Sequence, residues 1–338
     1  MPCIRLVIIF ALSGLLSTPH TGWASQIPAA RFYCSTASPL GATYTDLKAG
    51  IHLRLPVPFV IDIDGMLAGP AGYLALTGED KLAIYHDGRH ILTVKAPQAR
   101  LIGWIHQRLV FRERDSQTRG LDVRTGKVVQ TRLPPGLVDL GAVHGDTYQI
   151  EQRGTTVIGT SFGKGRAKKR SWAAARRNCG FCSTARIGNR YLVLELHQLT
   201  RAADGSWASD TIRAPQLWVI DFATGRQRRL AVRRFTLGFC VGRIPAEMLL
   251  GLPAAVSKDG HVAYSRVVAV DLRTLRQRTL LRKKGALDLV GLSDDGRWLL
   301  ATQGRAEVGS GSLLAVHLSD GSERVLQKGV YDCAPSAA

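Results

Sequence analysis

Two stretches of this sequence nearly repeat one another: GFCSTARI at 180–187 and GFCVGRI at 238–244. They belong to a longer periodicity. An apolar strand, a tight turn and a second strand recur along the chain, as in KLAIYHDGRHILTV, LWVIDFATGRQRRLAV and LLAVHLSDGSERVL. Asp-Gly and Thr-Gly pairs supply the positive φ that tight hairpin turns require. A short inner strand and a strong apolar strand precede each hairpin, so the repeating unit has four strands.

The inner strand of each repeat carries a glycine, and these glycines follow one another at intervals of about 40 to 60 residues. The chain after its N-terminus shows no helical period. Serial four-stranded units of this length predict an all-β β-propeller with six blades, whereas a β-sandwich does not require six copies of one hairpin. The predicted blades span 61–97, 98–134, 137–174, 179–232, 235–283 and 286–328, with anchoring glycines Gly65, Gly103, Gly141, Gly180, Gly238 and Gly291.

The two ends of the chain are expected to close the ring. Residues 25–60 contain the strand-like RFYCS and GIHLRLPVPF, and VYDC precedes the 334–338 tail. Because an open propeller leaves an unpaired strand edge, we expect an N-terminal strand to pair with the last blade. Cys34 and Cys333 would then be neighbours. We predict a disulfide between them, which stabilises the fold by up to roughly 4 to 5 kcal/mol in the chain-entropy model.

Residues 1–24 have the pattern of a secretory signal peptide. The apolar run from Leu6 to Leu16 is too short to span a bilayer, and small residues precede a cleavage point after Ala24. We therefore expect an exported chain, periplasmic or extracellular, with no membrane span in its mature part. Export also makes disulfides the default state of paired cysteines.

The cysteines pose a separate question. The chain has 6, and Cys3 falls in the signal peptide, so an odd number remains. Cys179 and Cys182 have the spacing of a thiol–disulfide exchange site, but strand and turn residues follow them in place of the helix that lowers a thiol pKa. Since Cys182 and Cys240 occupy equivalent repeat positions, we predict a structural disulfide from Cys240 to Cys182 or Cys179, with redox activity as the alternative. A zinc site is not expected, because a second cysteine pair and suitably spaced histidines are missing.

The chain is strongly basic, with a formal net charge of +19, and loss of the signal peptide removes only Arg5 from the charged residues. Its cations gather beside turns in RQRRLAVRR, RQRTLLRKK and GKGRAKKR. Such residues also protect exposed strand edges, and net charge bears on association more than on fold. We expect a monomer whose basic hairpins aid encounter with a protein or anionic envelope component. We expect no cofactor and no nucleic acid partner.

The turns after the inner strands repeat at equivalent places and are predicted to surround one mouth of the axial channel. The candidate ligand-binding residues at these turns are His106, His144, Arg186, Arg243, Asp294 and Asp295. The insertion at 197–216 carries a further candidate, Trp207, either as an exposed binding anchor or folded back onto its blade.

No catalytic residue is predicted, because the chain lacks a GxSxG elbow, an HExxH helix and a P-loop. No metal ligand is predicted either. The recurring Asp122, Asp221 and Asp271 are expected to stabilise turns.

GLSDDGRWLLAT at 291–302, followed by LLAVHLSDGSERVL at 313–326, resembles the TolB-like and related WD-type propeller repeats of bacterial exported proteins. KLAIYHDGRHILTV and LWVIDFATGRQRRL share part of the same pattern. The resemblance implies a rigid platform for protein or ligand contacts, so we expect a noncatalytic binding protein. The alternatives are a carbohydrate-active or other small-molecule enzyme with a site in the axial channel, and thiol–disulfide exchange at CGFC.

Overall fold

The computed structural model describes residues 30–335, except for 38–39, 63–64, 114–116, 135, 144–145, 163–168, 203, 210–214, 233–238, 243–245, 257–261 and 305–310. The predicted signal peptide at 1–24 therefore lies outside the described residues. Those that are described form β-strands and turns, together with one short 3-10 segment, η1 (Pro70–Gly72). They include no helix of the length and apolar character needed to cross a membrane.

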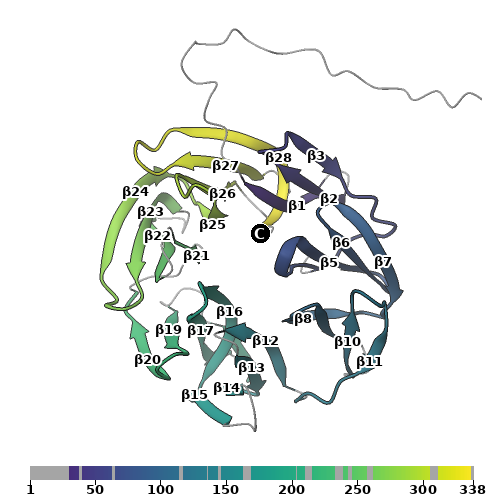
Figure 1. Cartoon of the computed structure of the whole chain (residues 1–338). Helices are drawn as coiled ribbons and strands as arrows, with labels where there is room; N and C mark the ends of the chain where they lie inside the picture. The colour runs from purple at the N-terminus through teal and green to yellow at the C-terminus, as the bar shows by residue number, and fades with distance from the viewer. Residues whose placement is uncertain are drawn as a thin grey trace, which may run out of the picture.

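The strands group into antiparallel units of four, which we number along the chain (Figure 1). Unit 2 consists of β4 (Met66–Ala68), β5 (Tyr73–Gly78), β6 (Lys81–His86) and β7 (Arg89–Lys95). Unit 3 consists of β8 (Arg100–Ile105), β9 (Arg108–Arg112), β10 (Thr118–Asp122) and β11 (Val128–Gln130). Unit 4 consists of β12 (Leu137–Val143), β13 (Asp146–Arg153), β14 (Thr156–Phe162) and β15 (Lys169–Arg177).

The second half of the chain continues this pattern. Unit 5 consists of β16 (Cys179–Ile187), β17 (Tyr191–Arg201), β19 (Gln216–Asp221) and β20 (Arg226–Leu230), with β18 (Trp207–Ser209) added to the end of β17. Unit 6 consists of β21 (Phe239–Val241), β22 (Glu247–Val256), β23 (Val262–Asp271) and β24 (Gln277–Lys284). Unit 7 consists of β25 (Asp288–Leu292), β26 (Trp298–Gln303), β27 (Gly311–His317) and the first part of β28 (Glu323–Pro335).

The N-terminal segment forms a unit of its own. Unit 1 contains β1 (Arg31–Ala37), β2 (Leu40–Asp46) and β3 (Ile51–Arg54), and its inner strand is the second part of β28. Val330 is the point of transfer, because it pairs with β27 on one side and with β1 on the other. The pairing thus gives seven units among the described strands, one more than the six blades predicted. The prediction treated the N-terminal segment as a single closing strand.

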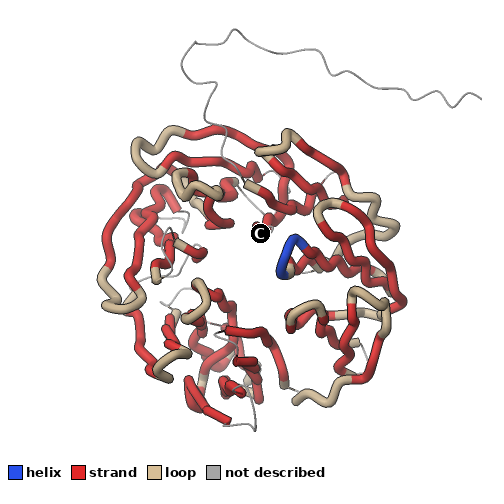
Figure 2. The backbone as a smooth tube through the Cα atoms, viewed as in Figure 1, coloured by secondary structure: helices blue, strands red, loops and turns tan. Residues whose placement is uncertain are grey.

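The sheets are arranged in a ring, as Figures 1 and 2 show, and hydrophobic clusters lie between neighbouring units. Each of seven clusters draws its side chains from two adjacent units. Along β17, for example, Leu194 faces the cluster shared with unit 4, while Val193 faces the one shared with unit 6. Phe32 and Trp298 belong to the cluster that joins unit 1 to unit 7. The alternation of side chains along each strand therefore supplies both faces of every blade, and the predicted all-β propeller fold is confirmed.

The predicted disulfide between Cys34 and Cys333 is present at this closure. The two residues are direct partners in the β1–β28 pair, with Cα atoms 4.1 Å apart. Both are buried within the cluster that joins units 7 and 1. The covalent bond therefore lies inside the same layer of side chains that closes the ring.

Candidate functional site

Unit 5 differs from its neighbours by a ribbon that continues β17 beyond its sheet. The first part of β17 pairs with β16 and β19, and Leu199 to Arg201 pair with β18. The carboxylate of Asp204 holds the connecting turn by accepting hydrogen bonds from the backbone N–H and the hydroxyl of Ser206, at 2.9 and 2.6 Å. This ribbon is the described part of the predicted insertion at 197–216.

Trp207 lies on the ribbon opposite Arg201, and 49% of its surface is exposed. Of the two positions expected for this side chain, the structure shows the exposed one. Arg201 and His197 are separated by an even number of residues along β17, so their side chains lie on the same face of the strand as Glu195. The exposed indole therefore belongs to a face that also carries a histidine and a carboxylate.

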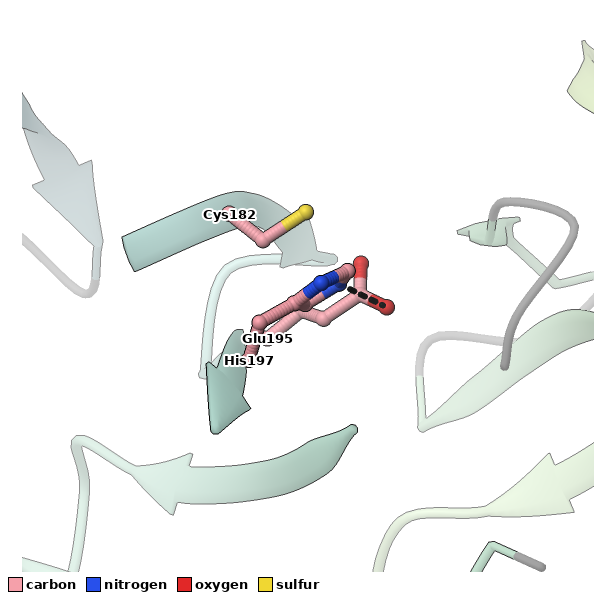
Figure 3. Close-up of side chains that lie close together, drawn as sticks. All are labelled: Cys182, Glu195 and His197. Atoms are coloured by element: carbon pink, nitrogen blue, oxygen red, sulfur yellow. Dashed lines mark ion pairs between the residues drawn. The ribbon is translucent and has the colours of Figure 1, made fainter. Parts of the chain in front are cut away.

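At the base of the ribbon, the side chains of Cys182, Glu195 and His197 come together (Figure 3). One potential ligand atom from each residue lies within 4.8 Å of the other two. Nε2 of His197 is 3.7 Å from Oε1 of Glu195. Among the residues that the structure describes, no other three histidine, cysteine or acidic side chains meet in this way. We refer to these three residues as the Cys182 cluster.

A β-bulge places Cys182 in this cluster. The register between β16 and β17 shifts between Phe181 and Ser183, so Cys182 is the extra residue on its strand. Bulges redirect a side chain out of the regular alternation and are frequent beside functional sites. Ser183 is paired with Glu195, and its hydroxyl donates a hydrogen bond to Oε2 of that carboxylate at 2.8 Å.

The electrostatics of the cluster do not suit thiol–disulfide exchange. Glu195 is 4% exposed. Desolvation, reinforced by the Glu195 charge, raises the pKa of the Cys182 thiol to about 12. Exchange requires a lowered thiol pKa. In addition, Cys179 is buried in the cluster between units 4 and 5 and forms no disulfide with Cys182.

The predicted disulfide from Cys240 to Cys179 or Cys182 is wrong, since all three are thiols. Equivalent repeat positions put these cysteines in different layers. Cys240 packs between units 6 and 7, whereas Cys179 packs between units 4 and 5. Burial raises the pKa of Cys240 to about 12. A whole blade interface therefore separates Cys179 from Cys240.

The candidate residues of the channel mouth lie at the turns after the inner strands. His106 follows β8, Arg186 is near the end of β16, and Asp294 and Asp295 follow β25; all four are exposed. His144 and Arg243 lie outside the described residues. Because Cys182 is near the start of β16, Arg186 is at the opposite end of that strand, about 13 Å away at 3.3 Å per residue. The structure does not bring the mouth candidates together with the ribbon.

A buried carboxyl group between units 4 and 5 was missed by the sequence reasoning. Oδ2 of Asp139 accepts hydrogen bonds from the hydroxyls of Tyr148 and Thr184, at 3.2 and 2.6 Å. Desolvation raises the pKa of Asp139 to about 6, although these hydrogen bonds and the charge of Arg186 oppose the shift. Asp139 follows no recognisable motif, and one of its two hydrogen-bond donors, Thr184, comes from the neighbouring blade.

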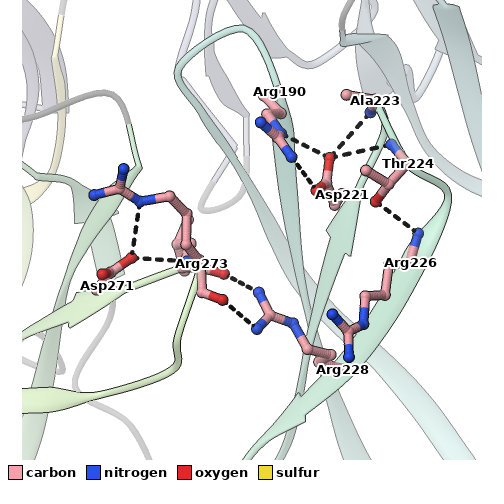
Figure 4. Close-up of polar contacts among 9 residues, drawn as sticks. Arg190, Asp221, Ala223, Thr224, Arg226, Arg228, Asp271 and Arg273 are labelled. Carbon is pink, nitrogen blue, oxygen red and sulfur yellow. Dashed lines mark hydrogen bonds and ion pairs between the residues drawn. The ribbon is translucent and has the colours of Figure 1, made fainter.

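The hairpin aspartates act as turn residues, as expected (Figure 4). Oδ1 of Asp221 accepts the backbone N–H of Ala223 at 3.0 Å, and Arg190 donates hydrogen bonds to both carboxylate oxygens. Asp122 and Asp271 likewise accept backbone N–H groups two residues ahead. These aspartates therefore stabilise the turns.

Basic side chains cover the outer strands and turns of units 5 and 6. Arg228 links the two units by donating to the backbone carbonyls of Leu272 and Arg273 (Figure 4). Arg273, Arg278 and Lys283 form ion pairs with acidic side chains. Five further cations are exposed and form no ion pair with a described acid: Arg226, Arg229, Arg276, Arg282 and Lys284. We call these five residues the basic edge.

Comparisons with known proteins bear on the fold. No protein-family model matches the chain, and no curated protein matches it by sequence. Oligogalacturonate lyase in complex with manganese has a TM-score of 0.55 at 10% identity, over 83% of each chain. Hydrazine synthase of Kuenenia stuttgartiensis has a TM-score of 0.53 at 10% identity, over 93% of this chain and 100% of the other.

TolB from Acinetobacter baumannii is also similar, with a TM-score of 0.48 at 15% identity, over 93% of this chain and 81% of TolB. All three identities are too low to carry an activity across. The oligogalacturonate lyase and hydrazine synthase structures are similar to this chain in fold alone.

Proposed function

We propose that this chain is an exported binding protein whose propeller presents the β17–β18 ribbon to an anionic envelope saccharide. The observation that carries the proposal is Trp207, which is half exposed on a ribbon that no other unit possesses among the described strands. Tryptophan and arginine are the side chains most enriched at the energetic centres of binding surfaces. Trp207 and its strand partner Arg201 supply one of each.

The charge of the molecule supports an anionic ligand. The basic edge lies on units 5 and 6, so it flanks the blade that carries the ribbon. Clustered charge of one sign raises the rate of encounter with oppositely charged ligands, and salt weakens this effect. The disulfide between Cys34 and Cys333 fits a protein that folds in an oxidising compartment, periplasmic or extracellular.

Polygalacturonate is the first probe, because it is a polyanionic saccharide and a lyase named for its oligomers shares the fold. We expect the full chain to bind it at low ionic strength and to release it as salt is added. Trp207→Ala is expected to weaken binding at least tenfold while leaving the melting temperature nearly unchanged. Ile91→Ala is the matched control, since Ile91 is 44% exposed on unit 2, away from the ribbon.

Equal binding by the parent and Trp207→Ala would refute the role of the ribbon. The double variant Arg282→Ala/Lys284→Ala tests the basic edge separately. We expect it to reduce the salt dependence and to weaken binding several-fold. Binding of neutral, fully methyl-esterified polygalacturonate with the same affinity would contradict an anionic ligand.

An enzyme with an axial site is the second candidate, and Asp139 is the observation that favours it. A carboxyl group with a pKa near 6 next to a cation is frequent among catalytic groups. Turnover of oligogalacturonate that is abolished by Asp139→Asn, with binding retained, would replace the noncatalytic proposal. The hydrogen bonds from Tyr148 and Thr184 give Asp139 a structural role as well, so the binding function is preferred.

A further inference from the structure

We propose that Cys182, Glu195 and His197 bind a zinc ion and leave its fourth coordination position open. This site is distinct from the exposed surface of the ribbon that carries the proposed function. It rests on the positions of three side chains and on the backbone that holds them.

The spacing of the three side chains suits a single ion. Tetrahedral zinc binds sulfur at about 2.3 Å and nitrogen or oxygen at about 2.0 Å, which places the ligand atoms of a site with one sulfur roughly 3.3 to 3.5 Å apart. The separation of 3.7 Å between Nε2 of His197 and Oε1 of Glu195 exceeds this range by only about 0.2 Å. All three ligand atoms are within 4.8 Å of one another, so small rotations about the side-chain bonds complete the set.

The backbone explains why these residues meet. Glu195 and His197 are two residues apart on β17 and therefore share a face, while the bulge in β16 directs Cys182 to them (Figure 3). Both strands belong to the inner, hydrogen-bonded part of unit 5. A site on paired strands holds its ligands more rigidly than a site on loops.

The carboxylate is already oriented for this role. Ser183 donates its hydroxyl hydrogen to Oε2 of Glu195, while Oε1 is the oxygen that faces His197. A hydrogen bond to the distal oxygen of a ligating carboxylate is the usual support for a metal ligand. Ser183 therefore acts as a positioning residue for the Glu195 carboxylate.

The chemistry of the donors selects the metal. A thiolate, an imidazole and a carboxylate favour zinc over calcium or magnesium, which prefer oxygen ligands alone. Three protein ligands with an open fourth position are typical of zinc sites that bind an exchangeable ligand. On binding, the Cys182 thiol loses its proton to solvent and the sulfur gains a bond to zinc. Histidine and carboxylate ligands bind zinc in their deprotonated forms.

Metal titration of the full, untagged chain tests the site. After the chain has been treated with a chelator and the chelator removed, we expect calorimetry to show one zinc ion bound per chain. Because binding releases a proton to the buffer, the measured binding enthalpy is expected to differ between buffers. Cobalt serves as the spectroscopic probe, because a cobalt–thiolate bond gives a charge-transfer band in the near ultraviolet. Cys182→Ser is expected to abolish this band and to weaken zinc binding at least tenfold.

Matched variants separate the site from general effects. His197→Ala and Glu195→Gln are expected to weaken zinc binding at least tenfold, whereas Cys240→Ser is expected to leave both zinc affinity and the cobalt band unchanged. Ser183→Ala is expected to weaken zinc several-fold without removing the band. Circular dichroism checks that each variant is folded, and Cys182→Ala replaces the serine variant if that one is not.

The proposal is overturned if the parent takes up no zinc, or if its binding survives in Cys182→Ser and is lost in Cys240→Ser. The result is independent of the saccharide assay. Trp207→Ala is expected to bind zinc as the parent does, so failure of the ribbon's function and failure of the metal site are distinguishable.

Discussion

Cys34 and Cys333 stand directly opposite one another in the β1–β28 pair and are joined by a disulfide, although 299 positions separate them in the sequence. Replacement of both by alanine is expected to lower the free energy of unfolding by about 2 to 4 kcal/mol, because the unfolded chain regains the entropy of a very long open loop. Urea denaturation measures this difference. Ile91→Ala is the control, since Ile91 is an exposed side chain on unit 2, outside the bridge.

The closure prediction would be contradicted by a double variant with the same urea midpoint as the parent. Reductant gives an independent check. In dithiothreitol, the parent protein is expected to have the same urea midpoint as the double variant. The urea midpoint of the double variant is expected to be the same with and without dithiothreitol.

Asp139 is expected to make the protein less stable as the pH rises. Its pKa is raised to about 6 by desolvation, so the folded chain holds this proton more tightly than the unfolded chain does. The free energy of unfolding therefore falls between about pH 4 and pH 6 and then levels off. Asp139→Asn is expected to remove a fall of about 2 kcal/mol, measured by urea denaturation at pH 4 and pH 7. A parent and variant that change in parallel between these two pH values would contradict this role.

The pair between Arg190 and Asp221 has the opposite dependence on pH. Hydrogen bonds from Arg190 are the main cause that lowers the pKa of Asp221 to about 2. Its contribution to stability is therefore complete above about pH 4 and is lost as the pH falls toward 2. Because Arg190 is 45% exposed, we expect only about 1 kcal/mol of destabilisation for Asp221→Asn at neutral pH.

A double-mutant cycle with Arg190→Ala isolates this interaction from the turn bonds of Asp221. The coupling energy is expected to shrink between pH 4 and pH 2. A coupling that stays constant over that interval would show that the backbone hydrogen bonds, and not the ion pair, account for the lowered pKa.

Units 3 and 4 approach one another closely at Gly103. Its partner across the β8–β12 contact is Leu140, and a Cβ on Gly103 would overlap the carbonyl oxygen of that residue. Gly103→Ala is therefore expected to lower the free energy of unfolding by about 1 to 3 kcal/mol, as overpacking does in cores. Gly120→Ala in the same unit is the comparison, because the side chains of Arg108 and Thr131 that it meets can move. Similar losses in the two variants would argue against the close approach as the cause.

The propeller was predictable because each repeat depends on interactions between residues that are close in the sequence. Asp221 and Gly225 form their turn with neighbours a few residues away, and the strands on either side alternate regularly. Unit 1 was not predictable in this way. The need to close the ring predicted the pairing of Cys34 with Cys333, but it did not predict that β28 continues from unit 7 to supply the inner strand of a further unit.

The Cys182 cluster escaped the sequence reasoning for a different reason. Metal-site motifs have ligands at fixed intervals in the sequence. Cys182 and Glu195, in contrast, are brought together only by the register between β16 and β17. A one-residue bulge decides which way the cysteine points, and it follows from how β16 and β17 pair. The same limitation explains the incorrect Cys240 bridge, because equivalence between repeats gives similar positions in different blades.

Because β28 belongs to both unit 7 and unit 1, unit 1 can be completed only after the C-terminal strand has been synthesised. During synthesis, β1 can pair with β2 as soon as both have been made. Its other edge remains unpaired until the segment around Cys333 has been synthesised. Nascent unit 1 is therefore exposed to pairing with foreign strands until translation is nearly complete. A chaperone that covers this edge, or delayed oxidation of Cys34, would protect the incompletely closed propeller from aggregation.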